Sequence, residues 1–273
     1  MAIAQVGGVE LAYELRGQEG DPLVLVHGSW VDRRSWDRIL PVLEGSFRVL
    51  VYDRRGHGGS ERTASAYRID QDVEDLAGLL HALDHFPAHV LGHSLGGSVA
   101  ARLATSRPDL LRSLLVHEPP LFGLLPEDDP EVARVRETAD LVAAQIADGD
   151  ARGAARRFID SLALRPGAWA GLPVATQELL VANAPRWAAE YADATSFVID
   201  RGRLREFDPP ALVTTGEESL PVYARVSEAL FETLPNATLT RLPRVGHLPH
   251  VTDPALYLGV LLSFTLERNV PTS

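Results

Sequence analysis

Short apolar runs rich in valine and leucine alternate along this chain with longer amphipathic segments. This alternation is typical of a parallel β-sheet flanked by helices, because a strand covered on both faces is apolar throughout, whereas a covering helix is apolar on one side only. It predicts an α/β fold with a doubly wound, mostly parallel sheet. The expected strands are residues 9–16, 23–27, 48–52, 89–92, 113–117, 211–215 and 238–242.

Two of the segments between these runs carry apolar residues at helical spacing, which predicts the core-facing side of a helix. The first stripe consists of Val73, Leu76, Ala77, Leu80 and Leu83. The second consists of Val222, Val226, Ala229, Leu230 and Leu234.

The alternation of strand-like and helical segments stops between residues 122 and 207, where the sequence consists of helical stretches rich in alanine and arginine. Prolines cannot donate to a β-ladder, so they mark where a sheet is left and rejoined. Such prolines stand at both ends of this region, at Pro119, Pro120, Pro126, Pro209 and Pro210. We therefore expect a core made of residues 1–121 and 208–273, with residues 122–207 inserted as a helical region.

Composition limits the kinds of partner. The chain has 273 residues, is 45% hydrophobic and carries a formal net charge of −11, which suits one large domain and argues against nucleic acid or an anionic membrane as a partner. No apolar run approaches the roughly 20 residues of a membrane span, and the N-terminal stretch lacks a signal-like apolar core, so we expect a cytoplasmic protein. With no cysteine, disulfides, thiolate catalysis and zinc–cysteine sites are excluded.

The motif G-x-S-x-G occurs in "AHVLGHSLGGSVAARLA", where it follows an apolar run and precedes a predicted helix. Its small residues, Gly92 and Gly96, allow a sharp strand-to-helix turn that exposes Ser94 in a cleft. The backbone N–H of Leu95 and the helix N-terminus then favour a developing oxyanion. We predict Ser94 as a nucleophile. A glycine-rich turn with an incidental serine is the plainer alternative.

Two other glycine-containing loops follow strands. In "LVLVHGSW", the pair His27-Gly28 lets the backbone turn and present the N–H of Ser29 to the same cleft as a second oxyanion donor, with the N–H of Trp30 as the alternative. In "YDRRGHGGS", Asp53 and His57 could be mistaken for catalytic groups. We interpret them as residues that brace their own loop.

These motifs together carry a resemblance to a known family. "HGSW", "DRRGHGGS", "GHSLGG" and "VGHLPH" stand in the order and spacing typical of α/β-hydrolase-fold serine hydrolases, and the chain resembles that family over essentially its whole length. The resemblance implies the α/β-hydrolase fold, with residues 122–207 as a helical cap over the cleft, and a serine acyl-enzyme route. The fold alone does not select a substrate.

A serine nucleophile needs a general base, and histidine suits that role near neutral pH. His247, in "RLPRVGHLPH", follows the last expected strand, at the position where the family carries its catalytic histidine. His250 lies three residues later, but two histidines without a third ligand are a weak metal signal. We expect His250 to line the mouth of the cleft.

The acid that holds the histidine is harder to place, because the usual position in "LVTTGEES" is occupied by Ser219. Ser219 resembles a helix N-cap before Pro221. The neighbouring strand offers Glu118 in "LLVHEPPLFG", which the two following prolines should hold in an extended backbone. Zearalenone lactonases resemble this chain in carrying "HE", followed closely by proline, at the end of that strand. We predict Glu118 as the acid, and the rival candidates are Glu217, Glu218 and Asp208.

The predicted activity is hydrolysis of a carboxylic ester or lactone by Ser94, His247 and Glu118, with the N–H groups of Ser29 and Leu95 as oxyanion donors. The resemblance to zearalenone lactonases implies a macrolactone of the zearalenone type as one candidate substrate. The alternatives are a C–C bond hydrolase acting on a diketone and a ligand receptor with the hydrolase fold. No cofactor or metal is implied, and a homodimer is left open. Cap side chains supply apolar surface for a hydrophobic substrate, and the expected substrate-binding residues are Trp30, Phe122, Trp187 and His250.

Overall fold

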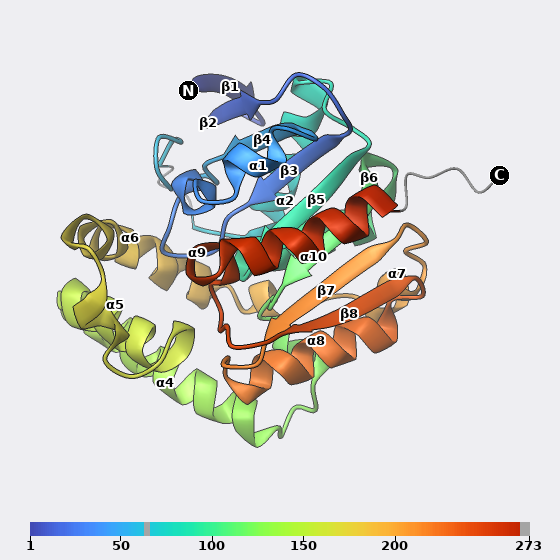
Figure 1. The fold of residues 1–273 in the computed structure, drawn as a ribbon. Coiled ribbons are helices and arrows are strands. Elements are labelled where there is room, and N and C mark those ends of the chain that lie inside the picture. The colour runs from blue at the N-terminus through green and yellow to red at the C-terminus, as the bar shows by residue number, and fades with distance from the viewer. Residues whose placement is uncertain (63–65, 268–273) are drawn as a thin grey trace.

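The computed structural model describes residues 1–62 and 66–267. Its centre is an eight-stranded sheet in the order β1-β2-β4-β3-β5-β6-β7-β8 (Figure 1). β1 and β2 run antiparallel to their neighbours, and all the other pairs are parallel. The strands are β1 (Ala2–Val6), β2 (Val9–Arg16), β3 (Pro22–Val26), β4 (Arg48–Tyr52), β5 (Ala88–His93), β6 (Leu111–His117), β7 (Ala211–Gly216) and β8 (Ala237–Leu242).

All seven strands expected from the sequence are present, each with ends within two residues of the prediction. The central strands β3, β5 and β7 are buried at every residue, as expected for strands covered on both faces. β1 was not predicted. It is a five-residue edge strand in which only two residues are buried, so it lacks the apolar run that marks the others.

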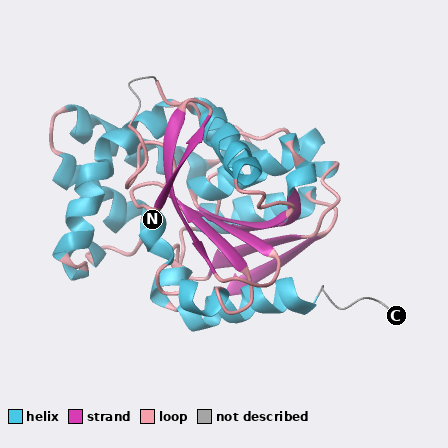
Figure 2. Ribbon diagram, turned by 90° about the horizontal axis from the view of Figure 1, so that it is seen from above, coloured by secondary structure: helices cyan, strands magenta, loops and turns pink. Residues whose placement is uncertain are grey.

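Helices cover both faces of the sheet, and the view from above shows the twisted strands between them (Figure 2). One face packs against α1 (Leu40–Leu43) and α10 (Pro254–Glu267) through a cluster that includes Leu25 and Tyr257. The opposite face packs against α2 (Ile69–Ala82), α3 (Leu95–Ser106) and α8 (Pro221–Thr233). The two predicted apolar stripes lie in α2 and α8, and the last residue of each stripe is the C-cap of its helix. The doubly wound architecture is therefore confirmed.

The elements between β6 and β7 are all helical, as expected of an inserted region. They include α4 (Pro130–Ala147), α5 (Ala151–Phe158), α6 (Val174–Ala192) and the short α7 (Arg201–Arg205). The cap helices α4, α5 and α6 lie together beyond the end of the sheet where the parallel strands finish (Figure 1). A short helix α9 (Pro249–Thr252) precedes α10. Among the described residues, no helix is both long enough and apolar enough to cross a membrane.

Candidate active site

Ser94 occupies the sharp turn between β5 and α3, with φ of 52° and ψ of −126°. This backbone conformation is rare outside glycine and costs about 1–3 kcal/mol, which the surrounding packing must outweigh. The packing is close because Gly92 and Gly96 have no side chains. A β-carbon at Gly92 would lie 2.3 Å from the carbonyl oxygen of Gly96, and one at Gly96 would lie 2.3 Å from that of Val26. The turn exposes part of the Ser94 side chain.

The two predicted oxyanion donors lie beside Ser94. Leu95 is the first residue of α3, so its N–H belongs to the electropositive helix N-terminus. The loop that carries Ser29 packs directly on the turn, since a β-carbon at Gly28 would lie 3.1 Å from the β-carbon of Ser94. Ser29, Ser94 and Leu95 all line one cavity. This arrangement suits a carbonyl oxygen that becomes negatively charged as Ser94 attacks.

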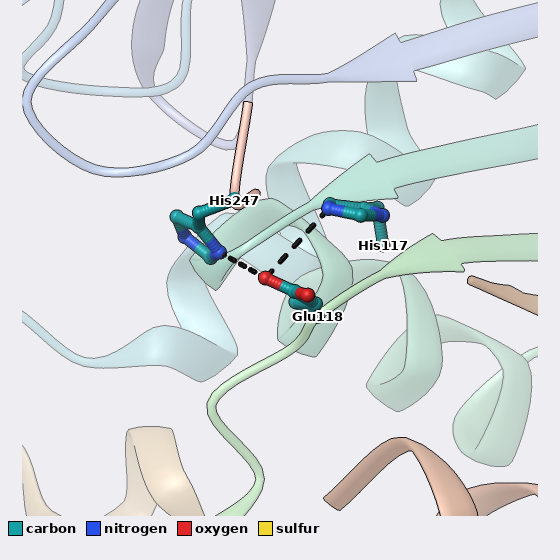
Figure 3. A group of neighbouring side chains, drawn as sticks. All are labelled: His117, Glu118 and His247. Atoms are coloured by element: carbon teal, nitrogen blue, oxygen red, sulfur yellow. Dashed lines mark hydrogen bonds and ion pairs between the residues drawn. The ribbon is translucent and has the colours of Figure 1, made fainter. Parts of the chain in front are cut away.

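Glu118 and His247 are in direct contact (Figure 3). Glu118 follows the last residue of β6 and is fully buried. Its Oε2 accepts a hydrogen bond of 2.6 Å from Nδ1 of His247. Its Oε1 accepts bonds of 2.8 Å from the Thr215 hydroxyl and 2.7 Å from the Gly216 N–H, both at the end of the neighbouring strand β7. The carboxylate therefore holds the imidazole with Nδ1 protonated, which leaves Nε2 as the free acceptor.

The electrostatic balance keeps Glu118 ionised. Burial by itself would raise the pKa of Glu118. Positive charge on the adjacent imidazoles, which His117 carries only at acidic pH, and the hydrogen bond from His247 outweigh that effect. The pKa is lowered from 4.5 to about 2. A buried carboxylate held in this way can stabilise a positive charge on His247 without taking up its proton.

The expected backbone of Glu118 was wrong. Its φ is +47°, whereas the two following prolines favour an extended conformation. The observed φ is accompanied by a carboxylate whose two oxygens are both bonded, to His247 and to the end of β7. Tertiary hydrogen bonds have therefore outweighed the local preference.

Among the described residues, no hydrogen bond or ion pair joins a rival acid to the His247 side chain. Glu217 and Glu218 are exposed after β7, and Asp208 is exposed and accepts a hydrogen bond from Asn236. Ser219 was expected at the N-cap of α8, but the N-cap is Leu220. Ser219 lies one residue earlier, in a turn closed by a 3.2 Å bond from its N–H to the carbonyl of Gly216.

Three further histidines surround His247. Nε2 of His93 donates to the carbonyl oxygen of His247 over 2.7 Å, which fixes the backbone of that residue. Nδ1 of His117 is 3.0 Å from the Thr214 hydroxyl. Burial lowers the pKa of His93 well below its usual value, that of His117 to about 4 and that of His250 to about 3. These three side chains are therefore neutral at neutral pH, so they add no positive charge that would compete with His247 for Glu118.

Ligand atoms of His117, Glu118 and His247 lie within 4.8 Å of one another, which raises the question of a metal site. Two nitrogen or oxygen ligands of tetrahedral zinc would be separated by about 3.3 Å. His247 Nδ1 and Glu118 Oε2 are only 2.6 Å apart. That separation fits a shared proton better than a shared ion, so the donor set does not fit zinc.

Two cavities meet at Ser94 and share Ser29 and Phe158. The first has a volume of 390 Å³ and lies under α4 and α6. The second has a volume of 430 Å³ and contains both Ser94 and His247. Of the expected substrate-binding residues, Phe122 and Trp187 line the first cavity, and Trp30 and His250 line the second.

An aromatic cluster separates the two cavities. The ring centroids of Trp30 and Phe158 are 4.9 Å apart, those of Trp30 and Trp187 are 5.3 Å apart, and those of Phe158 and Trp187 are 5.6 Å apart. Trp30 belongs to the core, whereas Phe158 ends α5 and Trp187 lies in α6. The cap therefore contacts the core at the point between the cavities.

Sequence reasoning missed Tyr223, Arg54 and Glu190. The Tyr223 ring stacks on His247 with centroids 4.6 Å apart and lines the first cavity. Its one sequence signal is its place two residues after Pro221, at the start of a helix that follows a strand. Arg54 and Glu190 form a buried ion pair of 2.8 Å. No sequence pattern joins these two residues.

Comparison with known proteins identifies the family. Residues 23–260 match the family described as "Alpha/beta hydrolase family". RutD of Pseudomonas syringae pv. syringae (strain B728a), provisionally named a carbamate hydrolase, is 31% identical over 262 residues, covering 89% of this chain and 92% of that protein. A hydrolase from Pseudomonas aeruginosa PA01 is 29% identical, with a TM-score of 0.81 over 96% of this chain and 97% of that one. An enol-lactonase from Burkholderia xenovorans LB400 shares the fold, at 22% identity and a TM-score of 0.79 over 96% of this chain and 99% of that one.

Proposed function

Because this chain belongs to the alpha/beta hydrolase family, we propose that it is a serine hydrolase that cleaves a carboxylic ester or a lactone through a covalent acyl-enzyme. The observation that carries the proposal is the 2.6 Å bond between His247 and the buried carboxylate of Glu118. His247 lines the same cavity as Ser94, which stands on a strained turn. This arrangement supplies Ser94 as the nucleophile, His247 in a single tautomer as the base, and the Glu118 carboxylate, which stays ionised.

The reaction begins when Nε2 of His247 takes the proton of Ser94 and the serine oxygen attacks the substrate carbonyl. The N–H groups of Ser29 and Leu95 bind the resulting oxyanion. Glu118 stabilises the imidazolium, which gives its proton to the leaving alcohol oxygen. Water then attacks the acyl-enzyme by the same route and releases the acid. In a lactone the alcohol and the acid are parts of one product.

The cavities support a substrate with apolar groups on both sides of the carbonyl. Their volumes of 390 Å³ and 430 Å³ lie in the range of pockets for drug-sized ligands, and their walls are rich in aromatic and aliphatic side chains. A macrolactone of the zearalenone type and a bulky linear ester both meet this description. The simplest carbamate has only a few heavy atoms and would leave most of this space empty, so we do not propose carbamate hydrolysis for this chain.

The test compares initial hydrolysis rates of zearalenone and of short-chain p-nitrophenyl esters, with Ser94→Ala as the blank. Ser98→Ala is the matched control, since this buried serine stands one helical turn further along α3 and its hydroxyl has no hydrogen-bond partner among the described residues. Ser94→Ala should abolish turnover and labelling by a fluorophosphonate, and Ser98→Ala should retain both.

Each alternative has its own outcome. Turnover of zearalenone that depends on Ser94 supports the macrolactone, and turnover of the simple esters alone supports a linear ester. Hydrolysis of a β-diketone without esterase activity would indicate a C–C bond hydrolase instead. Tight ligand binding that is unchanged in Ser94→Ala, without turnover, would indicate a receptor.

A further inference from the structure

A single buried arginine connects the loop that carries Ser29 to the cap. Arg54 follows β4 by two residues, and its side chain is fully buried. Its guanidinium donates to Asp72 over 2.5 Å and to Glu190 over 2.8 Å. A buried charge is tolerated only when it is paired and fully hydrogen-bonded. The two carboxylates meet that need, and they belong to α2 in the core and to α6 in the cap.

The same guanidinium also holds the backbone next to Ser29. Its Nε donates to the carbonyl oxygen of His27 over 3.0 Å, and its Nη2 donates to that of Gly28 over 3.2 Å. The Arg54 N–H donates to Nε2 of His27 over 3.0 Å, so the proton of that ring is on Nδ1. This Nδ1 donates to the Gly28 oxygen over 2.8 Å. The Gly28 oxygen therefore accepts two hydrogen bonds.

These two bonds determine the direction of the predicted oxyanion donor. The carbonyl of Gly28 and the N–H of Ser29 belong to one planar peptide unit, in which the two groups point in opposite directions. Donors that fix the oxygen on one side thereby fix the N–H on the other. A positive charge at the oxygen also polarises the peptide and strengthens the N–H as a donor. Arg54 thus acts on the Ser29 N–H without touching the cleft.

Glu190 gives this arrangement a connection to the substrate cavity. It is 2% exposed and lines the 390 Å³ cavity together with Ser29 and Ser94. Its Oε1 accepts the bond from Arg54, while its Oε2 is buried and has no hydrogen-bond partner among the described residues. A shift of α6 relative to the core would therefore move the carboxylate that shares Arg54 with the Gly28 oxygen.

We propose that Arg54 is a positioning residue: it orients the Gly28–Ser29 peptide for oxyanion binding and, through Glu190, makes that orientation depend on the seating of cap helix α6. The inference rests on the proposed function, because the direction of the Ser29 N–H matters only where an oxyanion forms. A substrate that fills the cavity beside Glu190 and fixes the position of α6 then aligns the Ser29 N–H with the oxyanion. Because this stabilises the transition state rather than the bound substrate, it raises kcat more than it lowers KM.

The experiment uses two inhibitors with the same alkyl chain, a trifluoromethyl ketone and a methyl ketone. The oxygen of Ser94 adds to the carbonyl carbon of the trifluoromethyl ketone, and the serine proton moves to His247. The resulting hemiketal oxyanion occupies the site beside the N–H groups of Ser29 and Leu95. The methyl ketone fills the same cavity without this addition. The ratio of the two inhibition constants therefore measures oxyanion binding separately from cavity binding.

Arg54→Lys keeps the charge but loses the fork that reaches two carbonyls and two carboxylates. We expect it to weaken the trifluoromethyl ketone about tenfold, less than the 10²–10³ that follows outright loss of an oxyanion donor, and to change methyl ketone affinity less than about twofold. Glu190→Gln should shift the same ratio in the same direction, although Glu190 does not contact residues 27–29 through any described hydrogen bond. Glu190→Gln also provides the test on its own if the Arg54→Lys variant does not fold.

Arg55→Lys is the matched control. Arg55 is the next residue of the loop, is buried and makes a two-pronged ion pair with Asp75, with both bonds at 2.6 Å. Its expected inhibitor ratio is that of the wild type. Equal ratios in all variants would overturn the inference, as would an Arg55→Lys shift as large as that of Arg54→Lys. A wild-type protein that binds both ketones alike would overturn the proposed function and this inference with it.

Discussion

At the scale of single residues, the main question is how Glu118, the proposed acid, reaches His247 from the end of β6, when the expected position of such an acid follows β7. The two strands are paired in parallel, with His117 opposite Thr214, so the residues after each strand end side by side. Glu118 reaches His247 with one oxygen and the end of β7 with the other. A carboxylate can thus come from either strand, provided that the neighbouring strand supplies donors for its second oxygen.

This geometry predicts the effect of Glu118→Gln. The Thr215 hydroxyl and the Gly216 N–H require an acceptor at the Oε1 position, so the new amide would place its NH₂ toward Nδ1 of His247. An NH₂ group there favours the tautomer with Nε2 protonated, which cannot accept the Ser94 proton. We expect kcat to fall by up to about 10⁴-fold, as when the acid of such a triad becomes an amide. Steady-state kinetics on the best ester measures this loss.

Glu218→Gln is the control for that variant, because Glu218 is exposed and lies at the strand where the acid would usually stand. Its kcat should stay within about twofold of the wild type, as for surface changes that contact no catalytic group. The reverse ranking of the two variants would mean that the acid belongs to the loop after β7.

At the scale of secondary-structure elements, the close approach of α3 to the strands determines where Ser94 lies. α3 packs on β3, β5 and β6, and it does so with glycine at its second and third positions. The space that these glycines leave empty lets the helix begin directly over the ends of the strands. The position of Ser94 is therefore set by the absence of two side chains.

Gly96→Ala tests this packing. Its new methyl group would lie 2.3 Å from the Val26 carbonyl and 2.4 Å from that of His27, both backbone atoms that cannot move aside. We expect a loss of several kcal/mol in the free energy of unfolding, in the upper range for single substitutions. Gly259→Ala is the matched control in α10, where a β-carbon meets nothing within 4 Å. That variant should gain up to about 1 kcal/mol from helix propensity. Urea unfolding followed by circular dichroism measures both.

The sequence was informative for elements whose signal is local. Apolar runs such as "LVLV" predicted the buried strands, and the glycine spacing around Ser94 predicted the turn. The edge strand β1 escaped because its burial alternates. Contacts between distant residues escaped as well: the Tyr223 ring on His247 and the Arg54–Glu190 pair depend on how separate elements pack. The positive φ of Glu118 was missed because long-range bonds outweighed the preference set by Pro119.

At the scale of the whole molecule, the distribution of histidines links stability to pH. Burial, the largest cause in each case, lowers the pKa of several of them, although the chain as a whole is acidic. The histidines affected are His27, His57, His85, His89, His93, His117 and His250. Each stays neutral in the folded protein at a pH at which the unfolded chain, with a usual value near 6.5, takes up a proton.

The sign of the effect follows from proton binding. Where the unfolded chain binds more protons, stability rises with pH, by about 1.4 kcal/mol per pH unit for each extra proton. The difference begins as pH falls below the unfolded value of about 6.5 and ends below the lowered folded values. For His89, whose folded pKa is about 4, the window is therefore roughly pH 6.5 to 4. The protein should lose stability steeply on acidification through this range.

His89→Gln tests this dependence at one position away from Ser94. His89 is in β5, 4% exposed, and its Nδ1 is 2.7 Å from the Ser113 hydroxyl, a partner that glutamine can also bond. We expect the slope of unfolding free energy against pH to become shallower by about 1 kcal/mol per pH unit between pH 4.5 and 6, whatever the change in absolute stability. His81→Gln, which removes an exposed imidazole from α2, is the matched control. Urea unfolding at half-unit pH steps gives both slopes, and equal slopes for the two variants would show that burial of His89 does not contribute to acid sensitivity.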